Sequence, residues 1–240
     1  MSSKISIQVS GRTDVGRKRS NNQDSFLVME SVRLFAVADG MGGHSGGEVA
    51  SALAVKTLEK VFSEPSQHSY PVKLEQSVML ANRVIFDQSS QNAHLNGMGT
   101  TLTAAVMHDD WLYIAQVGDS RLYLYREGLL YQLTEDHSQV YELIKAGIIS
   151  DANAGVFQKN VITRSVGYER TVNVDMCARK VMVGDIYLMC SDGLSGMVSN
   201  EQIAQILQNF SIDQAVNNLI ELANFNGGED NISVIVFEVG

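Results

Sequence analysis

Residues 34–47 read LFAVADGMGGHSGG, an apolar run that leads into Asp39 and is followed by a glycine-rich bend. Five consecutive apolar residues bounded by turn residues are typical of a buried strand. A carboxylate at the end of such a strand is costly to desolvate, so Asp39 needs hydrogen bonds, a cationic partner or a metal. Gly40, Gly42 and Gly43 permit a tight turn and leave backbone carbonyls open to a ligand. The stretch therefore predicts a buried strand that ends in a binding site.

A second apolar run, residues 186–193 (IYLMCSDG), also ends in an aspartate followed by glycine. Similar settings make five aspartates candidates for one site: Asp24 in NNQDS, Asp39, Asp119 in VGDSR, Asp192, and Asp230 in GGEDN. Taken singly, such an aspartate usually serves a turn or cap through its side chain. Asp39, Asp192 and Asp230 adjoin apolar strands that can converge in one core. Together they predict a site assembled from strand ends that are distant in sequence.

Converging carboxylates indicate a metal site, because they repel one another and raise each other's pKa unless cations lie between them. A ligand set made only of oxygen atoms favours Mg²⁺ or Mn²⁺, and no His or Cys spacing suggests zinc. The natural use of such a site is a two-metal hydrolase. Ions roughly 3.5–4 Å apart lower the pKa of a bound water and clamp a phosphate during in-line attack.

A phosphate substrate also needs a cation that is not a metal. Arg19, in RSNNQD, is suitable because a guanidinium can bind two phosphate oxygens at once. The alternative is that Arg17, Lys18 and Arg19 form a solvated basic loop. The glycine-rich bend itself matches neither nucleotide motif, since Ser45 stands at the third glycine of the dinucleotide pattern and no GK[ST] follows.

Composition limits the class of protein. The 240 residues are 45% hydrophobic and 19% charged with two prolines, which favours a compact core over disorder. The net charge of −9 and the pI near 5.0 count against a nucleic-acid partner. Cys177 and Cys190 have no CxxC spacing, which favours a reducing compartment. Neither a signal peptide nor a membrane span is evident, so we expect a cytoplasmic protein without a membrane partner.

The hydrophobic pattern predicts many short strands and two pairs of helices. Ile5, Ile7 and Val9 alternate with polar residues, and further strands are expected at 25–30, 32–38, 100–107, 111–117, 121–125, 129–133, 172–176, 186–190 and 231–239. The short connections between the central strands favour antiparallel neighbours. Two early helices carry apolar stripes at Val49–Val61 and Leu74–Ile85, and two late ones open with the capping boxes Ser199/Gln202 and Ser211/Gln214. This content predicts an α/β layered sandwich.

No linker or repeat divides the chain, so residues 1–240 are expected to form one domain. Residues 138–160 break the strand rhythm with one short helix, which ends near Gly147, and an Ala/Gly/Asn-rich stretch. We expect this segment to be a surface flap or lid.

Taken together, the motifs of the chain resemble those of the protein phosphatase 2C family in its compact bacterial form. The matching motifs run nearly from end to end: TDVGRKRSNNQD, VADGMGGHSGG, MGTT, VGDSR, LTEDHS, CSDGL and GGEDNISVIV. Each motif alone is weak, whereas seven in the right order are highly specific. The resemblance implies an αββα fold, two stacked mainly antiparallel sheets flanked by helix pairs, with the metals at one end between the sheets.

The resemblance also implies roles for single residues. Asp39 would bridge two Mn²⁺ or Mg²⁺ ions, the Gly40 carbonyl would bind one of them, and Asp192 and Asp230 would complete the shell of the first. Asp24 would act near the second ion through water. Asp119 matches a third, weaker metal position together with Asp192, and Arg19 matches the arginine that binds phosphate.

One departure from the family pattern concerns the general acid. Some members carry a histidine two residues after the aspartate of the DG motif, and here that residue is Met41. His44 lies nearby and is a candidate proton donor; the alternatives are that His44 shapes the loop or that metal-bound water is the acid. His137, in the DH pair, is interpreted as structural.

The function implied is hydrolysis of phosphoserine and phosphothreonine in proteins by a metal-activated water, opposing a cytoplasmic serine/threonine kinase in signal transduction. Cys177 and Cys190 lie outside every motif, so no thiol nucleophile is expected. Two alternatives stay open: a catalytically dead domain that only binds a partner, and a two-metal hydrolase of nucleotides or nucleic acid. Loss of Asp39, Asp192 or Asp230 would favour the first alternative, and a basic surface would favour the second. We expect a monomer.

Overall fold

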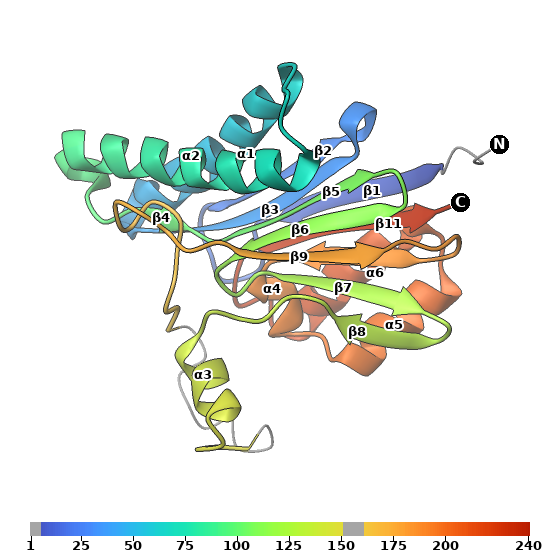
Figure 1. Ribbon diagram of the computed structural model, residues 1–240. Coiled ribbons are helices and arrows are strands. Elements are labelled where there is room, and N and C mark those ends of the chain that lie inside the picture. Colours follow the sequence, from blue (N-terminus) through green and yellow to red (C-terminus); the bar gives the residue numbers. More distant parts are fainter. Residues whose placement is uncertain (1–5, 151–160) are drawn as a thin grey trace.

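The computed structural model describes residues 6–150 and 161–240, without the side chains of residues 43–45. Two β-sheets stack face to face, and helices cover the outer face of each (Figure 1). The predicted αββα sandwich is therefore confirmed. The two ends of the described chain meet at one edge of the first sheet, where Ser6 and Gly240 exchange two backbone hydrogen bonds of 3.0 Å.

The first sheet has five strands, and every neighbouring pair is antiparallel. In spatial order they are β1 (Ile7–Asp14), β11 (Ile232–Val239), β10 (Ile186–Cys190), β7 (Arg121–Arg126) and β8 (Leu129–Gln132). Its outer face carries α4 (Asp192–Ser195), α5 (Asn200–Asn209) and α6 (Ile212–Phe225).

The second sheet is also antiparallel, in the order β2 (Asp24–Met29), β3 (Leu34–Met41), β5 (Leu102–His108), β6 (Trp111–Val117) and β9 (Asp175–Lys180). The short strand β4 (Gly99–Thr100) pairs with the far end of β3. The long helices α1 (Gly43–Ser63) and α2 (Tyr70–Gln91) cover the outer face. Two short 3₁₀ turns, Glu30–Val32 and Ala93–Leu95, complete this half.

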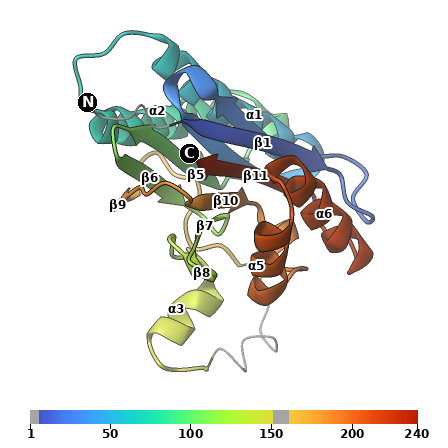
Figure 2. The same cartoon turned by 90° about the vertical axis from the view of Figure 1, so that its right-hand side faces the viewer.

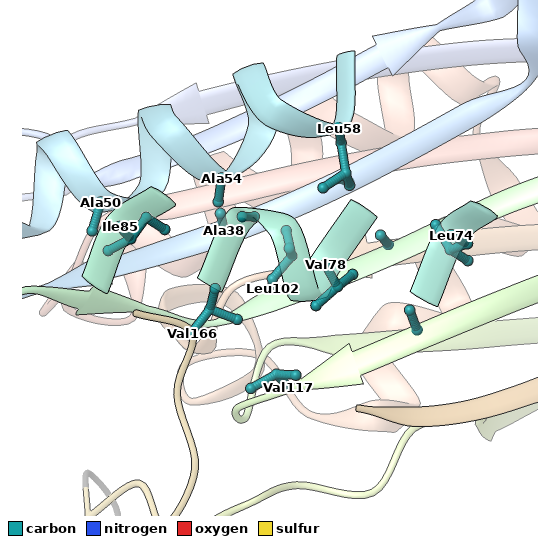
Figure 3. Close-up of a cluster of buried hydrophobic side chains, with 14 of the residues drawn as sticks. Ala38, Ala50, Ala54, Leu58, Leu74, Val78, Ile85, Leu102, Val117 and Val166 are labelled. Atoms are coloured by element: carbon teal, nitrogen blue, oxygen red, sulfur yellow. The ribbon is translucent and has the colours of Figure 1, made fainter. Parts of the chain in front are cut away.

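Strand β3 shows why this sequence requires covers on both faces. Alternate side chains of a strand point to opposite faces. Leu34, Ala36 and Ala38 pack under α1 and α2, while Phe35 and Val37 point into the core between the sheets. Figure 3 shows Ala38 facing Ala50 and Ala54 of α1, where small residues let the helix approach the sheet closely. A continuous apolar run is therefore the expected sequence for this strand.

The core between the sheets is closed by stacked aromatic rings. Phe237 of β11 lies 4.3 Å from Phe35 of β3 and 4.9 Å from Tyr187 of β10, measured between ring centroids. The contact between Phe237 and Phe35 joins the two sheets directly, whereas Tyr187 and Phe237 belong to the same sheet. Such stacking adds about 0.5–1.5 kcal/mol per pair to the free energy gained by burial.

Local signals explain where several helices begin and end. Both predicted capping boxes are present: Ser199 and Gln202 close the start of α5, and Ser211 and Gln214 close the start of α6. The segment predicted to be a flap contains α3 (Gln139–Lys145), whose N-cap Ser138 accepts a hydrogen bond from the backbone of Tyr141. The chain leaves α3 through Gly147 at φ +70°, and α3 stands away from both layers (Figure 2). Residues 151–160 of the predicted flap lie outside the described residues.

One predicted pairing is wrong. The short connection at residues 118–120 predicted that β6 and β7 are antiparallel neighbours, but they belong to different sheets. Gly118, at φ +103°, turns the chain from one sheet to the other. The side-chain amide of Gln116 donates to the carbonyls of Gly118 and Ser120, at 2.9 and 2.8 Å. These side-chain bonds satisfy carbonyl groups that a hairpin would pair within its own ladder.

The predicted strand at residues 172–176 is also displaced. The strand β9 begins at Asp175 and continues to Lys180. Val172 and Val174 pack beside the core under α2 without joining a strand, so burial alone produced the alternating pattern. Strand β3, in turn, continues through Asp39 to Met41 because β4 pairs with its last two residues.

Candidate metal centre

The predicted site lies where the ends of several strands meet. Asp24 and Asp39 are directly opposite each other in the antiparallel pair of β2 and β3. Asp192 begins α4 immediately after β10, and Asp230 lies just before β11, the neighbour of β10. Asp119 occupies the crossing between the sheets. The structure thus brings all five aspartates into one electrostatic cluster, in which the other four charges each raise the pKa of Asp39.

Asp39 is fixed by two threonines of the MGTT motif. The hydroxyl of Thr101 accepts from the Asp39 amide at 2.9 Å, and the Thr101 amide donates to the Asp39 carbonyl at 2.8 Å. The hydroxyl of Thr100 donates to the same carbonyl at 2.9 Å. Thr101 also contacts the hydroxyl of Ser120 at 2.7 Å, next to Asp119. The backbone amide and carbonyl of Asp39 are therefore satisfied by these threonines, and its carboxyl group lies in the aspartate cluster.

Ser191 joins the two sheets at the site. Its hydroxyl donates to Oδ2 of Asp24 at 2.7 Å and accepts from the backbone amide of Ser233 at 2.9 Å. Ser191 precedes Asp192 and is the N-cap of α4, so the same residue that starts the helix also orients Asp24. A hydrogen bond of this kind favours the ionised carboxylate.

Burial and mutual repulsion dominate the electrostatics. Burial is the largest cause that raises the pKa of Asp24 to about 7, although hydrogen bonds from Ser191 and Ser233 lower it. Burial likewise raises the pKa of Asp119 to about 7, with the charge of Asp192 as the next cause. The pKa values of Asp39 and Asp192 are raised for the same reasons. Below a pH of about 7, Asp24 and Asp119 therefore retain protons unless cations lie between the carboxyl groups.

The donor atoms fit divalent metal ions. Asp24, Asp119 and Asp192 each have a buried Oδ1 atom with no hydrogen-bond partner in the described part of the protein. Such atoms are costly unless a ligand satisfies them. As the side chains stand, no three carboxylate, imidazole or thiol groups of residues 6–150 and 161–240 enclose an ion position. Asp39 and Asp192 share a hydrogen bond, and a cation between the two carboxyl groups would take its place.

Arg19 lies at the site, but its partner differs from the predicted phosphate. Its Nη2 atom donates to Oδ2 of Asp230 at 2.7 Å, and its side chain is 47% exposed. The surrounding loop is held by Asn231, whose amide donates to the carbonyls of Val15 and Asn21, both at 2.9 Å. The side-chain oxygen of Asn231 accepts from the Gln23 amide at 2.8 Å. The guanidinium is therefore positioned at the aspartate cluster with part of its surface open.

Glycine is required at Gly40 by space. A Cβ atom at this position would lie 2.0 Å from the carbonyl oxygen of Gly47, a separation that real Cβ atoms essentially never show. The close approach of β3 to the start of α1 therefore needs both glycines of this part of the motif. The predicted role of the Gly40 carbonyl as a ligand stays a prediction.

His137 connects the Asp119 crossing to Asp175 at the start of β9. Its Nδ1 atom accepts from the Gly118 amide at 3.0 Å, which leaves the proton on Nε2, 3.0 Å from Oδ2 of Asp175. Burial lowers the pKa of His137, and the guanidinium of Arg164, 3.1 Å from Nε2, acts in the same direction. Both ring nitrogens of His137 therefore have a hydrogen-bond partner, and the bond to Asp175 opposes the fall in the pKa. The side chain of His44 lies outside the described residues.

Several residues that shape the site were not singled out from the sequence. Ser191, Asn231 and Thr101 lie inside the quoted motifs CSDGL, GGEDN and MGTT, and of these residues Ser191 and Asn231 are next to an aspartate. Their roles depend on partners far away in the chain, such as the 210 positions between Asn21 and Asn231. For Ser191 and Asn231 the signal that could have found them was an adjacent motif aspartate, and for Thr101 it was its place in the MGTT motif.

Comparison with known proteins supports the same interpretation. A family model described as "Protein phosphatase 2C" matches residues 13–221.

The chain belongs to the protein phosphatase 2C family.

Among relatives, the serine/threonine phosphatase stp of Listeria monocytogenes is 40% identical over 236 residues, covering 95% of this chain and 94% of the relative. The serine/threonine protein phosphatase PstP of Mycobacterium tuberculosis is 40% identical over 235 residues, covering 97% of this chain but 45% of that longer protein. A crystal structure of the PstP catalytic domain, described as a complex with two manganese ions, superposes with a TM-score of 0.91 at 38% identity, covering 98% of this chain and 99% of that one.

As a member of the protein phosphatase 2C family, the chain is a metal-dependent serine/threonine protein phosphatase. Manganese is the ion that the comparison supports, with two ions in the related catalytic domain. No helix among the described residues is long and apolar enough to span a membrane.

Proposed function

We propose that Asp39, Asp192 and Asp230, with the Gly40 carbonyl, hold the divalent ions, and that Asp24 acts through water and Asp119 at a third position. The observation that carries this assignment is the cluster of aspartates with three buried, unpartnered Oδ1 atoms. Carboxylates in such a cluster repel one another until cations enter. A bound divalent ion supplies a water of lowered pKa and neutralises charge on phosphate oxygens.

The residues of the chain prepare this site for a phosphorylated side chain. Thr100 and Thr101 hold the backbone of Asp39, and Ser191 orients Asp24, so that the oxygen ligands are preorganised. When the substrate binds, the Arg19 guanidinium leaves Asp230 and donates two hydrogen bonds to the phosphate oxygens of the substrate. Asp230 is then free to serve as a ligand. His44 remains the proposed proton donor to the leaving oxygen, with loop shaping or metal-bound water as the alternatives.

The wider assignment rests on the same family membership. We propose that residues 1–240 act as one phosphatase domain with residues 138–160 as its flap. Its substrates are phosphoserine and phosphothreonine proteins, and it opposes a serine/threonine kinase in the cytoplasm as a monomer. All of the metal-motif aspartates are present, which disfavours a domain that only binds a partner. The net charge of −9 disfavours a nuclease.

The test is release of inorganic phosphate from a phosphothreonine peptide with Mn²⁺, with Mg²⁺ and with EDTA. Release that depends on the ion and stops in EDTA is expected. Asp39→Asn should reduce kcat by at least about 100-fold, because a metal ligand is expected to contribute more than the residues that support it. In EDTA the same variant should unfold at a higher temperature than the wild type, because a neutral amide avoids the cost of burying a carboxyl group among four others, and it should gain little from Mn²⁺. Near-normal turnover with normal Mn²⁺ stabilisation would refute the assignment.

A further inference from the structure

A polar pocket of about 350 Å³ lies in the segment that leads from the flap to β9. It is lined by residues 162–165, 168–169 and 171–173, so one stretch of chain folds around it. Its volume is within the range of sites that hold small ligands or single side chains. None of its lining residues belongs to the aspartate cluster, and the proposed chemistry does not use it.

Hydrogen bonds and close packing hold the segment that forms the pocket in its conformation. Asn82 of α2, 1% exposed, donates to the carbonyls of Glu169 and Arg170 at 3.0 and 3.2 Å and accepts from the Gly167 amide at 2.7 Å. Gly167 has φ +91°, and a Cβ there would lie 2.1 Å from Ile85. Arg164, which also lines the pocket, is held by Asp175 and by the carbonyl of Asn173. The segment that forms the pocket is therefore anchored to the fold at several points.

A ladder of backbone pairs connects the pocket to the metal turn. Val166 bridges to Thr100, and Thr100 pairs with Gly40 (Figure 1 shows this segment passing β4). Paired strands are about 4.8 Å apart, so two steps separate Gly40 from Val166 by about 10 Å. A Cβ at Gly99 would lie 3.3 Å from the hydroxyl of Ser165, a pocket residue. An extended peptide covers this distance in roughly three residues.

The charges of the residues that line the pocket indicate which kind of ligand group it can bind. Arg164 is neutralised by its ion pair with Asp175. Glu169 is exposed, and no ion pair to it is found within residues 6–150 and 161–240. Tyr168 is 63% exposed, so its ring face is available to a cation. A carboxylate beside an open aromatic ring, on a protein of net charge −9, favours a basic group.

We propose that this pocket binds a lysine or arginine side chain of the substrate about three residues from the phosphorylated threonine or serine. This assignment rests on the proposed phosphatase function, and it adds Tyr168 and Glu169 as specificity-determining residues. The phosphorylated residue occupies the aspartate cluster, while the peptide runs past β4 and places its basic side chain between Tyr168 and Glu169. In this binding mode, the other residues of the peptide do not occupy a pocket.

The experiment uses phosphothreonine peptides of alanine and glycine with one lysine placed at each position from −5 to +5. With Mn²⁺, kcat/KM should rise about two- to fivefold at a position two to four residues from the phosphothreonine, as expected for one partly exposed cation site. Glu169→Gln and Tyr168→Ala should each remove this preference. Glu169→Lys should reverse it, so that a glutamate at the same position is favoured. Glu75→Gln, the same charge change at an exposed position of α2, should leave it intact.

Two further measurements separate this inference from the proposed function. Phosphate release from the lysine-free peptide and from para-nitrophenyl phosphate reports catalysis alone, and all of these variants should match the wild type. If catalysis is present but lysine has no positional effect, or the effect survives in both Glu169→Gln and Tyr168→Ala, the pocket proposal is wrong. If no substrate is hydrolysed, the proposed function fails, and binding of the same labelled peptides by fluorescence anisotropy decides the pocket by the same comparison.

Discussion

At the scale of single residues, Asp230 and Arg19 show how one contact can serve two states. The guanidinium pairs with one carboxylate of a cluster of five aspartates, and the same group is suited to bind phosphate oxygens. A protein that binds both a cation and an anion at one place benefits from a side chain that can change partners. Lys18, next in sequence, contributes its backbone amide to Gly228 rather than a charge to the cluster.

This pairing predicts that Arg19→Ala weakens binding of the phosphorylated substrate. We expect KM to rise about 10- to 100-fold, since hydrogen bonds to charged groups contribute about 1.5–3 kcal/mol, with a smaller change in kcat. Steady-state kinetics on a phosphothreonine peptide measures both values, under conditions where substrate binding is at equilibrium. Lys18→Ala is the matched control, and an equal effect of both substitutions would support the alternative of a merely basic loop.

At the scale of elements, the positions of the functional loops depend on buried side chains as much as on the strands. Asn231 fixes the loop that carries Arg19, and Asn82 fixes the turn that forms the pocket. Both asparagines are buried, and each satisfies backbone groups that have no strand partner. The sheets place the elements approximately, and these amides set the final positions of the functional loops.

We predict that Asn82→Ala reduces the free energy of unfolding by about 1–3 kcal/mol, because the Gly167 amide and two carbonyls lose a buried partner. Urea denaturation measures the change. Asn209→Ala is the control: this exposed asparagine donates only to the carbonyl of Gln205 on the surface of α5. Its substitution should alter the free energy by less than about 0.5 kcal/mol. Equal effects of the two substitutions would contradict the proposed role of Asn82.

At the scale of the whole molecule, the aspartate cluster links stability to pH and metal. The pKa values of Asp24 and Asp119 are raised to about 7, well above those of an unfolded chain near 3.9. Between these values the folded, metal-free protein retains protons that the unfolded chain has lost. The free energy of unfolding therefore falls as pH rises from about 4 to about 7, by up to about 1.4 kcal/mol per pH unit for each proton retained.

In EDTA we accordingly expect the unfolding temperature to be higher at pH 5.5 than at pH 7.5, with Mn²⁺ restoring stability at pH 7.5. A free Mn²⁺ concentration of 100 times the dissociation constant adds about 2.7 kcal/mol to the free energy of unfolding. Differential scanning calorimetry at both pH values, with and without Mn²⁺, measures the effect. An EDTA-treated protein that is more stable at pH 7.5 than at pH 5.5 would show that these carboxyls are already ionised without metal.

The sequence by itself determined the elements and the family. The pattern of apolar residues predicted β3, β10, β11 and the helix pairs, because an element that is buried on one or two faces carries apolar residues at regular positions in the sequence. The capping boxes of α5 and α6 were readable for the same reason: their partners are three residues apart. The aspartates of the site were recognisable from short motifs in a specific order.

Only the tertiary structure decided how these pieces meet. That β6 and β7 belong to different sheets, that Asp24 lies opposite Asp39, and that Asn82 holds a turn 85 or more positions later follow from packing. So do the contacts of Ser191 with Asp24 and of Asn231 with the Arg19 loop. A hydrogen bond between distant residues depends on the position of the whole backbone, and no local pattern of side chains records that position.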